Sequence, residues 1–196
     1  MDETPLATMT DRRNPLSAEQ TLTLHEDRLE SWADNSLTRR ISLDTVSQVR
    51  LAVEMAGQQS QVVCRVTGPS GEIVFGSRRA NNGAFDDNVV EFQALMVALH
   101  TALRPRFDQI GFVEGQSVGF KLIMAGLGLA LAAVALAFMG WMSAVEGSAM
   151  LTVAGLPFLA IGGYLAWVFR PTAPLAYDPE KLIERFSCDT AEDTSA

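Results

Sequence analysis

The sequence predicts an α+β protein in which an antiparallel β-rich domain, closed by one amphipathic helix, precedes a two-helix transmembrane hairpin. Three observations support this prediction. Polar and apolar residues alternate in short segments between positions 20 and 77, and a helical apolar stripe follows between 88 and 103. Two windows without charged residues, 122–145 and 147–169, each exceed the roughly 20 residues that a helix needs to cross a bilayer.

Composition limits the classes of function that this chain can serve. Its 196 residues suit one domain of ordinary size with a small appendage. The formal net charge of -8 argues against nucleic-acid binding, which requires a basic surface, and against a polybasic lipid anchor. Cys64 and Cys188 lie far apart and form no disulfide framework.

The N-terminal part of the chain is expected to contain a disordered segment, 1–16, followed by a folded domain over 17–106. Residues 1–16 include acids and have no apolar core of the kind found in signal peptides. The clearest strand covers 48–55, and a hairpin over 61–77 turns at the Gly-Pro-Ser-Gly sequence of 68–71. The alternation predicts that one face of the first strand points inward, with Val49, Leu51, Val53 and Met55.

The helix that closes this domain is expected to begin near Asn88. Glu91 stands three residues further on, which is the spacing of a capping box, and Pro105 ends the helix. A helix with one apolar stripe has to cover a sheet. The stripe contains Val89, Phe92, Leu95, Met96, Leu99 and Leu103.

The order of strands and helix resembles a bacterial pleckstrin-homology-like (PH-like) domain of a membrane protein. The stretches that carry the resemblance are TLTLHEDRLESWA, RRISLDTVSQVRL, VVCRVTGPSGEIVF and EFQALMVALHTAL. The resemblance implies a bent barrel with the helix plugging one end, and a binding or scaffolding role without catalysis. The first loop, 25–27, is acidic where phosphoinositide-binding members place cations, so headgroup binding is not carried over.

The apolar windows predict transmembrane helices at 122–145 and 146–169, joined by an outer tip at 143–148. A juxtamembrane linker, 107–121, precedes them, and a tail, 170–196, with a short helix at 178–186 follows. Cations flank the hairpin at both ends and are absent from its tip. The positive-inside rule therefore predicts a multi-pass protein of the bacterial inner membrane with both termini in the cytoplasm.

Small residues recur at helical spacing on both predicted spans and form candidate packing surfaces. The two spans either pack on each other or leave a small face for a partner helix or a second copy. The windows 122–145 and 147–169 contain no Asp, Glu, Lys, Arg or His, which weighs against a pump. The candidate packing residues are Gly126, Ala130, Gly155, Gly162 and Ala166.

Six arginines are candidates for contact with lipid or a partner. The alternative interpretation is a solvated surface in which acids neighbour these arginines, because adjacent strand residues point to opposite faces. The six are Arg39, Arg40, Arg50, Arg65, Arg78 and Arg79.

Residues with catalytic chemistry occur without a recognisable arrangement. His25 and His100 have no cysteine or second histidine at ligand spacing, so we expect no metal site, cofactor or catalytic set. The sequence therefore favours a membrane-tethered recognition or scaffold module over an enzyme, with the bilayer and a protein as its partners and without nucleic acid. The alternative is an accessory subunit of an oligomeric transporter or channel.

Overall fold

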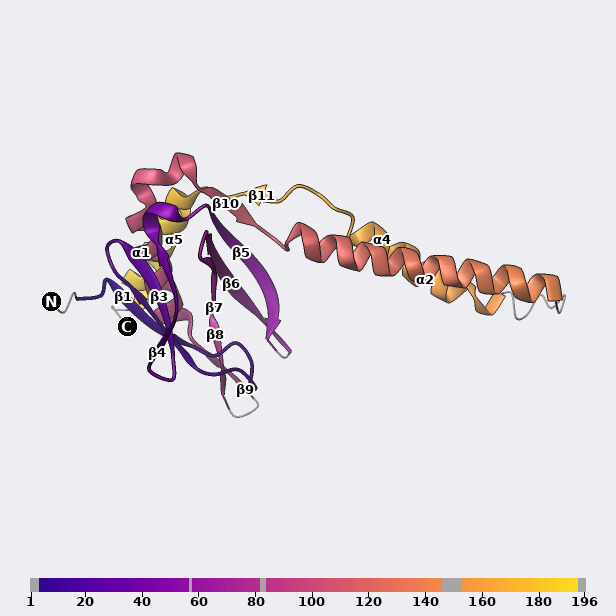
Figure 1. The fold of residues 1–196 in the computed structure, drawn as a ribbon, viewed down its shortest axis with the longest axis horizontal. Coiled ribbons are helices and arrows are strands. Elements are labelled where there is room, and N and C mark those ends of the chain that lie inside the picture. Colours follow the sequence, from indigo (N-terminus) through magenta and orange to yellow (C-terminus); the bar gives the residue numbers. More distant parts are fainter. Residues whose placement is uncertain (1–3, 57, 82–83, 146–152, 194–196) are drawn as a thin grey trace. The chain divides into compact units, whose positions relative to one another are not determined.

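The computed structural model describes residues 4–56, 58–81, 84–145 and 153–193. It confirms the α+β class, with several antiparallel sheets and one long apolar helix (Figure 1). The chain divides into two compact units. Unit 1 comprises Met1–Gly115 together with Leu175–Ala196, and unit 2 comprises Gln116–Pro174. The polar and apolar parts of the sequence therefore form separate bodies.

The first sheet of unit 1 is an antiparallel meander of four strands in chain order. Asp34 and Asn35, both with positive φ, make the two-residue turn before the last strand, as turn residues of this kind do in hairpins. The strands are β1 (Ala7–Asp11), β2 (Gln20–Leu24), β3 (Arg28–Ala33) and β4 (Ser36–Ser42).

The second sheet has the strand order β11-β10-β5-β6-β7 and is antiparallel except where β10 pairs parallel to β5. The predicted hairpin is confirmed, with its turn at Gly68–Gly71 between β6 and β7. The strands are β5 (Gln48–Ala56), β6 (Gln59–Gly68), β7 (Gly71–Gly76), β10 (Gly111–Glu114) and β11 (Leu175–Ala176).

Shorter elements connect the second sheet to the predicted helix. A short ribbon, β8 (Arg78–Asn81) and β9 (Ala84–Asp87), leads into α1 (Val89–Leu103). Short 3-10 helices lie at Leu43–Thr45 and Arg104–Gln109.

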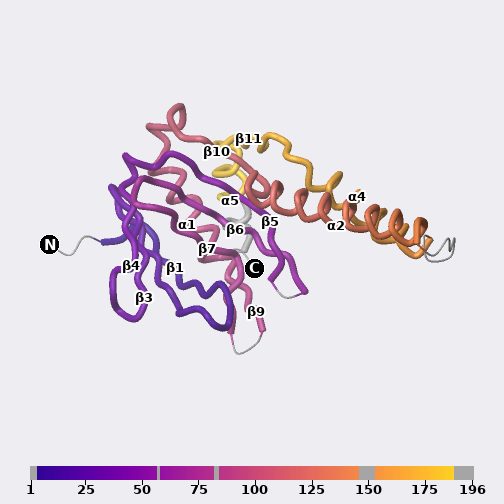
Figure 2. Tube along the Cα trace, turned by 45° about the vertical axis from the view of Figure 1, so that its right-hand side comes forward, coloured from indigo at the N-terminus to yellow at the C-terminus, as the bar shows by residue number. Residues whose placement is uncertain are grey.

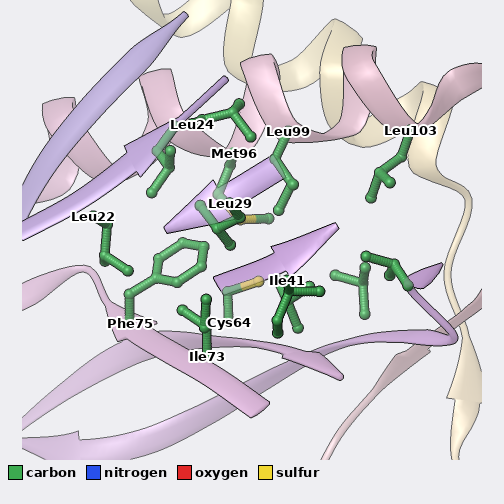
Figure 3. Packing of buried hydrophobic residues seen from close by; sticks show 14 of the residues in the cluster. Leu22, Leu24, Leu29, Ile41, Cys64, Ile73, Phe75, Met96, Leu99 and Leu103 are labelled. Atoms are coloured by element: carbon green, nitrogen blue, oxygen red, sulfur yellow. The ribbon is translucent and has the colours of Figure 1, made fainter. Parts of the chain in front are cut away.

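The core of unit 1 lies between α1 and the strands. Figure 3 shows Met96, Leu99 and Leu103 of α1 pointing toward strand residues that include Leu29 and Cys64. The stripe residues from Phe92 to Leu103 are at most 2% exposed, so the helix covers the sheets as the sequence predicts. Val89, the first residue of the predicted stripe, is 36% exposed.

The predicted capping box is wrong. Asn88 makes no side-chain cap bond to α1. Its Nδ2 instead donates to Thr10 O at 2.8 Å, and Glu91 Oε2 accepts a bond from Thr10 N at 3.1 Å. Both side chains therefore form hydrogen bonds with the backbone of Thr10 in β1. These bonds connect the edge strand β1 of the first sheet to the start of α1.

The prediction of a disordered 1–16 segment is also wrong. Within it, β1 pairs with β2 along its whole length, and Met9 and Asp11 are almost completely buried. The sequence ATMTD contains one large apolar residue, so its local pattern is too weak to indicate a strand. The strand is stabilised by its pairing with β2 and its contacts with α1, which are distant in sequence.

The segment 107–121 is not a juxtamembrane linker along its whole length. Gly111–Glu114 forms β10 beside β5, and Ile110 and Phe112 are buried in the core. Four residues carry little strand signal, and a parallel partner more than 60 positions away cannot be read from local alternation.

The inward face predicted for β5 is correct only as far as Leu51. Val53 and Met55 are 66% and 68% exposed, whereas Ala52 on the opposite face is buried. The core does not extend beyond Leu51 on this face of β5. On the opposite face, the loop after β1 contacts the strand, where Arg13 Nη2 bonds Glu54 Oε2 at 3.0 Å.

The C-terminal segment returns to unit 1. Helix α5 (Pro179–Asp193) is longer than the predicted 178–186 and packs beside α1, as Figure 2 also shows. Tyr177, Leu182 and Phe186 pack against the core of unit 1. The predicted tail is therefore partly an integral element of the folded unit.

Unit 2 contains α2 (Val118–Val145) and α4 (Leu156–Val168). Among the described helices, α2 is the one long and apolar enough to cross a membrane. It begins before the predicted 122–145 span, and the second predicted span, 146–169, is described only from residue 153 onward. Within the predicted tip, 143–148, residues 146–148 lie outside the described residues.

Candidate functional site

Two sheet edges of unit 1 are joined by side chains instead of by a strand ladder. β4 and β7 are the last strands of their respective sheets. Two side-chain donors bridge these edges by bonding backbone carbonyls, and a third donor, Gln20 of the interior strand β2, bonds another carbonyl of β7. We call these three bonds the seam. The seam consists of Ser70 Oγ to Arg40 O (2.8 Å), Arg39 Nη1 to Glu72 O (2.7 Å) and Gln20 Nε2 to Val74 O (2.8 Å).

The geometry of β7 explains why such donors are needed. Glu72 and Val74 are two positions apart in the strand, so their carbonyls point toward the same edge. An unpaired edge carbonyl is an acceptor for any incoming strand. Arg39 and Gln20 occupy these acceptors, so the seam closes an edge that would otherwise be open to pairing.

A cavity of about 280 Å³ lies at the seam. Its lining includes Arg13, Gln20, Ser31, Arg39 and Glu72. Ser31 Oγ donates to Gln20 Oε1 at 3.1 Å, which orients the amide so that its nitrogen faces Val74 O. The cavity can therefore admit a side chain next to two guanidinium groups.

Charges alternate behind the cavity. Glu54 accepts from Arg13 and from Arg65 at 3.0 and 2.8 Å, and Arg65 also lies 3.7 Å from Glu72. All four side chains are partly exposed, so each pair contributes little stability by itself. Together they fix the orientation of the guanidinium groups around the cavity.

Asp11 is buried beside this network. Burial raises the pKa of its carboxyl to about 6, against the opposing effects of the Gln20 hydrogen bond and the Arg13 charge. Gln20 Nε2 lies 3.4 Å from Asp11 Oδ2, whereas Oδ1 has no hydrogen-bond partner in the described part of the chain. The buried carboxyl is thus connected to the seam through Gln20.

The structure brings only some of the six predicted arginines together. Arg39 and Arg65 meet around Glu72. Arg40 points to the other face of its strand and pairs with Glu30 at 2.8 Å. Arg50 bonds Gln48 Oε1 at 3.2 Å in the second sheet.

The last two arginines lie on the β8–β9 ribbon. Arg78 Nε donates to Ser60 O at 3.1 Å, and Arg79 lies opposite Asp86 in the register of the ribbon. The six predicted arginines are therefore distributed over different surfaces instead of sharing one.

Glu30 anchors the outer face of the first sheet. It is 3% exposed, and burial by itself would raise the pKa of its carboxyl. Hydrogen bonds from Arg28 and Trp32 and the charge of Arg40 outweigh burial and hold that pKa below its usual value. Arg40 is therefore engaged in a structural network away from the cavity.

The helix packing in unit 2 uses a different face of α2 from the predicted one. A Cβ added at Gly128 would lie 2.7 Å from Gly162 O and 2.7 Å from Ala166 N. Gly155, which precedes α4, is also buried. Of the predicted packing residues, Gly162 and Ala166 lie at this contact with Gly128.

Gly126 and Ala130 do not face α4. A Cβ added at Gly126 would meet no atom within 4 Å, and Ala130 is exposed. Because Gly126 and Gly128 are two positions apart on a helix, they lie on different faces, and only one of these faces can meet α4.

His100 is a further buried polar residue of unit 1. It is fully buried, and burial lowers the pKa of its imidazole to about 4, although the bond to Met96 O acts in the opposite direction. The described residues contain no group of three or more His, Cys, Asp or Glu side chains placed to hold a metal ion. The lowered pKa keeps His100 neutral at neutral pH. Its ring links α1 to the C-terminal segment, because Nε2 lies 2.9 Å from the hydroxyl oxygen of Tyr177.

Sequence reasoning missed Gln20 and Ser70, two of the three seam donors. Both are polar residues in or beside strands, where polar side chains are common, so no local signal separates them from solvated neighbours. Gln20 and Ser70 become seam donors only because the two sheets approach each other in the folded structure.

The fold and the site define an α+β protein with a side-chain-closed sheet edge and a helix of membrane-spanning length. Comparison with known proteins found no family model, curated protein or solved structure that matches the chain.

Proposed function

We propose that this chain is a membrane-tethered recognition module without catalytic activity. In this proposal unit 1 is a PH-like domain at the cytoplasmic face of a bacterial inner membrane, and unit 2 is a transmembrane hairpin. The observation that carries the proposal is the seam, because it provides a strand edge and a cavity at which a protein partner can bind.

The chain path supports the hairpin topology. Glu114 of β10 pairs with Leu175 of β11, so the chain leaves unit 1 and returns to it at the same two-stranded ladder. An excursion that begins and ends on one side of a membrane crosses it an even number of times. The 28 residues of α2, about 42 Å long, are sufficient for one crossing, and α4 belongs to the return path.

The order of elements supports the PH-like assignment. A four-stranded meander precedes β5, β6 and β7, and α1 follows with its apolar face on the core of both sheets. Only Asn88 separates α1 from the β8–β9 ribbon, which is an addition to the strand order that the sequence predicts.

The seam supports binding of an extended segment. A partner strand along β7 would donate its backbone N–H groups to the carbonyls of Glu72 and Val74. These bonds would replace the hydrogen bonds from Arg39 and Gln20. The released guanidinium of Arg39, next to Arg13, would favour an acidic side chain in the cavity.

Photocrosslinking in native membranes tests this proposal. A benzophenone amino acid at Thr38, which is exposed and lines the cavity, is expected to capture a discrete protein partner. The matched position is Thr101, exposed on α1, which is expected to give no such product. Arg39→Lys should keep the charge but weaken the capture at Thr38, because Lys lacks the planar guanidinium. Equal capture at both positions would contradict a role for the seam.

One observation favours the alternative, an accessory subunit of an oligomeric transporter or channel. Gly126 and Ala130 present small residues on the side of α2 that α4 does not cover. Crosslinks obtained through Gly126 and not through Thr38 would support this alternative over the recognition module.

A further inference from the structure

The far end of the β5–β6 hairpin carries two exposed apolar side chains. Val53 and Met55 are 66% and 68% exposed, whereas Val49 on the same strand face is fully buried in the core. The hairpin therefore continues beyond the part of the sheet that the core covers.

The adjoining part of the hairpin is uncharged. From Met55 to Cys64 the sequence contains no charged residue. Glu54 lies between the two apolar side chains in sequence but points to the opposite face, where it pairs with Arg13 and Arg65. One face of the hairpin end can thus enter an apolar environment without desolvating an unpaired charge.

The direction of this hairpin is set by the strand that leads to α2. β10 runs parallel to β5, with Gly111 opposite Gln48 and Glu114 opposite Leu51. Gly115 N then donates to Leu51 O at 2.8 Å. β5 and β10 therefore run in the same direction up to Leu51 and Gly115, and three residues further along the chain α2 begins.

The distances along the two paths are similar. Met55 lies four residues beyond Leu51, which is about 13 Å of strand. Val118, the first residue of α2, lies three residues beyond Gly115, which spans at most about 10 Å of extended chain. The end of the hairpin and the first residue of α2 are therefore at similar chain distances from the hydrogen bond between Leu51 and Gly115.

We infer that the β5–β6 hairpin is a membrane-interface anchor that inserts Val53 and Met55 into the headgroup layer of the bilayer. The inference rests on the proposed membrane tether. The hairpin supplies a further attachment besides the two chain connections to unit 2, and it limits the orientations of unit 1 at the surface. The occupant of this apolar face is lipid, because the adjacent strand leads directly into the helix of membrane-spanning length.

Spin labelling of the full chain in phosphatidylcholine–phosphatidylglycerol vesicles tests the inference. Single cysteines at Met55, Pro69 and Ala130 are labelled in a Cys188→Ser background, with Cys64 left in place because it is fully buried. Pro69 is the matched exposed position, about 30 Å away beyond the other end of β6. Ala130 reports on α2 itself. The measured quantity is the ratio of accessibility to oxygen and to a water-soluble nickel complex.

The expected result is a membrane depth for the Met55 label within about 10 Å of the phosphate level, a bilayer value for Ala130 and an aqueous value for Pro69. An aqueous value at Met55 with a bilayer value at Ala130 would overturn the anchor and leave the tether intact. Low accessibility of Met55 to both reagents would indicate a protein contact and would also overturn the anchor. An aqueous value at Ala130 would overturn the tether and the anchor together.

Discussion

His100 Nε2 lies 2.9 Å from the hydroxyl oxygen of Tyr177, across 77 positions of sequence that include all of unit 2. The other ring nitrogen, Nδ1, lies 2.8 Å from Met96 O, which can only accept, so Nδ1 carries the proton. Nε2 is therefore the acceptor and the tyrosine hydroxyl is the donor. Phe112 packs against both rings, at centroid distances of 5.6 Å.

Tyr177→Phe should destabilise unit 1. The substitution leaves Nε2 of the buried His100 without a donor, which costs about 1–3 kcal/mol. Hydrogen exchange of the α1 amides in the full chain measures this loss as a smaller free energy of opening. Tyr164→Phe is the control, because Tyr164 is 63% exposed on α4 and should leave α1 exchange unchanged. Equal exchange in the Tyr177 variant and the wild type would contradict the role of the pair.

Acid should destabilise unit 1 through His100. Its folded pKa of about 4 lies below the ordinary 6.5, so the unfolded chain binds more protons between these pH values. Stability is therefore fully present above pH 6.5 and falls by about 3 kcal/mol as the pH decreases to 4.

The His100 effect is best measured as the urea midpoint against pH in an Asp11→Asn background, where the opposing titration of Asp11 is absent. His100→Gln should flatten the profile between pH 4 and 6.5. A profile of unchanged slope in this variant would assign the acid sensitivity to another group.

Asp11→Asn should stabilise the protein at neutral pH. The folded pKa of Asp11, about 6 against the ordinary 3.8, means that the folded state binds more protons in this range. Wild-type stability therefore falls as the pH rises from 3.8 to 6, by about 3 kcal/mol. The variant should gain that amount at pH 7.5 and nothing at pH 3.5. Asp44→Asn is the matched control, because Asp44 is exposed. A gain at both pH values would contradict a titration effect.

Gly128→Ala should weaken the contact between α2 and α4. The added methyl would lie 2.7 Å from backbone atoms of the partner helix, so the helices have to separate. We expect a loss of about 1–3 kcal/mol. The matched variant Gly126→Ala meets no atom within 4 Å and should be neutral. Thermal melting in detergent micelles, followed by the fluorescence of Trp141 and Trp167, compares the two. Equal melting temperatures would mean that the close approach at Gly128 is absent in the protein in solution.

Sequence patterns predict those elements whose signal is local. The stripe from Phe92 to Leu103 has helical spacing and is buried as expected. The β6–β7 hairpin has alternating strands around a Gly-Pro-Ser-Gly turn, and the structure confirms it. In these segments the residues that determine the structure are neighbours in the chain.

The remaining features depend on partners that are distant in sequence. Gly126 and Gly128 both belong to stripes of small residues, and only the position of Gly162 selects between them. Asn88 has the sequence context of a helix cap, yet its side chain makes no cap bond and donates through Nδ2 to Thr10 O of β1. At the candidate site, Arg39 was predicted as a contact residue, but its bond to Glu72 O depends on the meeting of two sheets.

The return of the C-terminal segment to unit 1 determines the order of events during biosynthesis. Tyr177, Leu182 and Phe186 pack on the core, and the ribosome makes them after all of unit 2. The nascent N-terminal strands and α1 must therefore remain incompletely covered until the apolar segment has emerged. Translation of the final helix is the step that completes the folded unit, so a stop codon before Leu175 would leave the newly made domain with an open apolar surface.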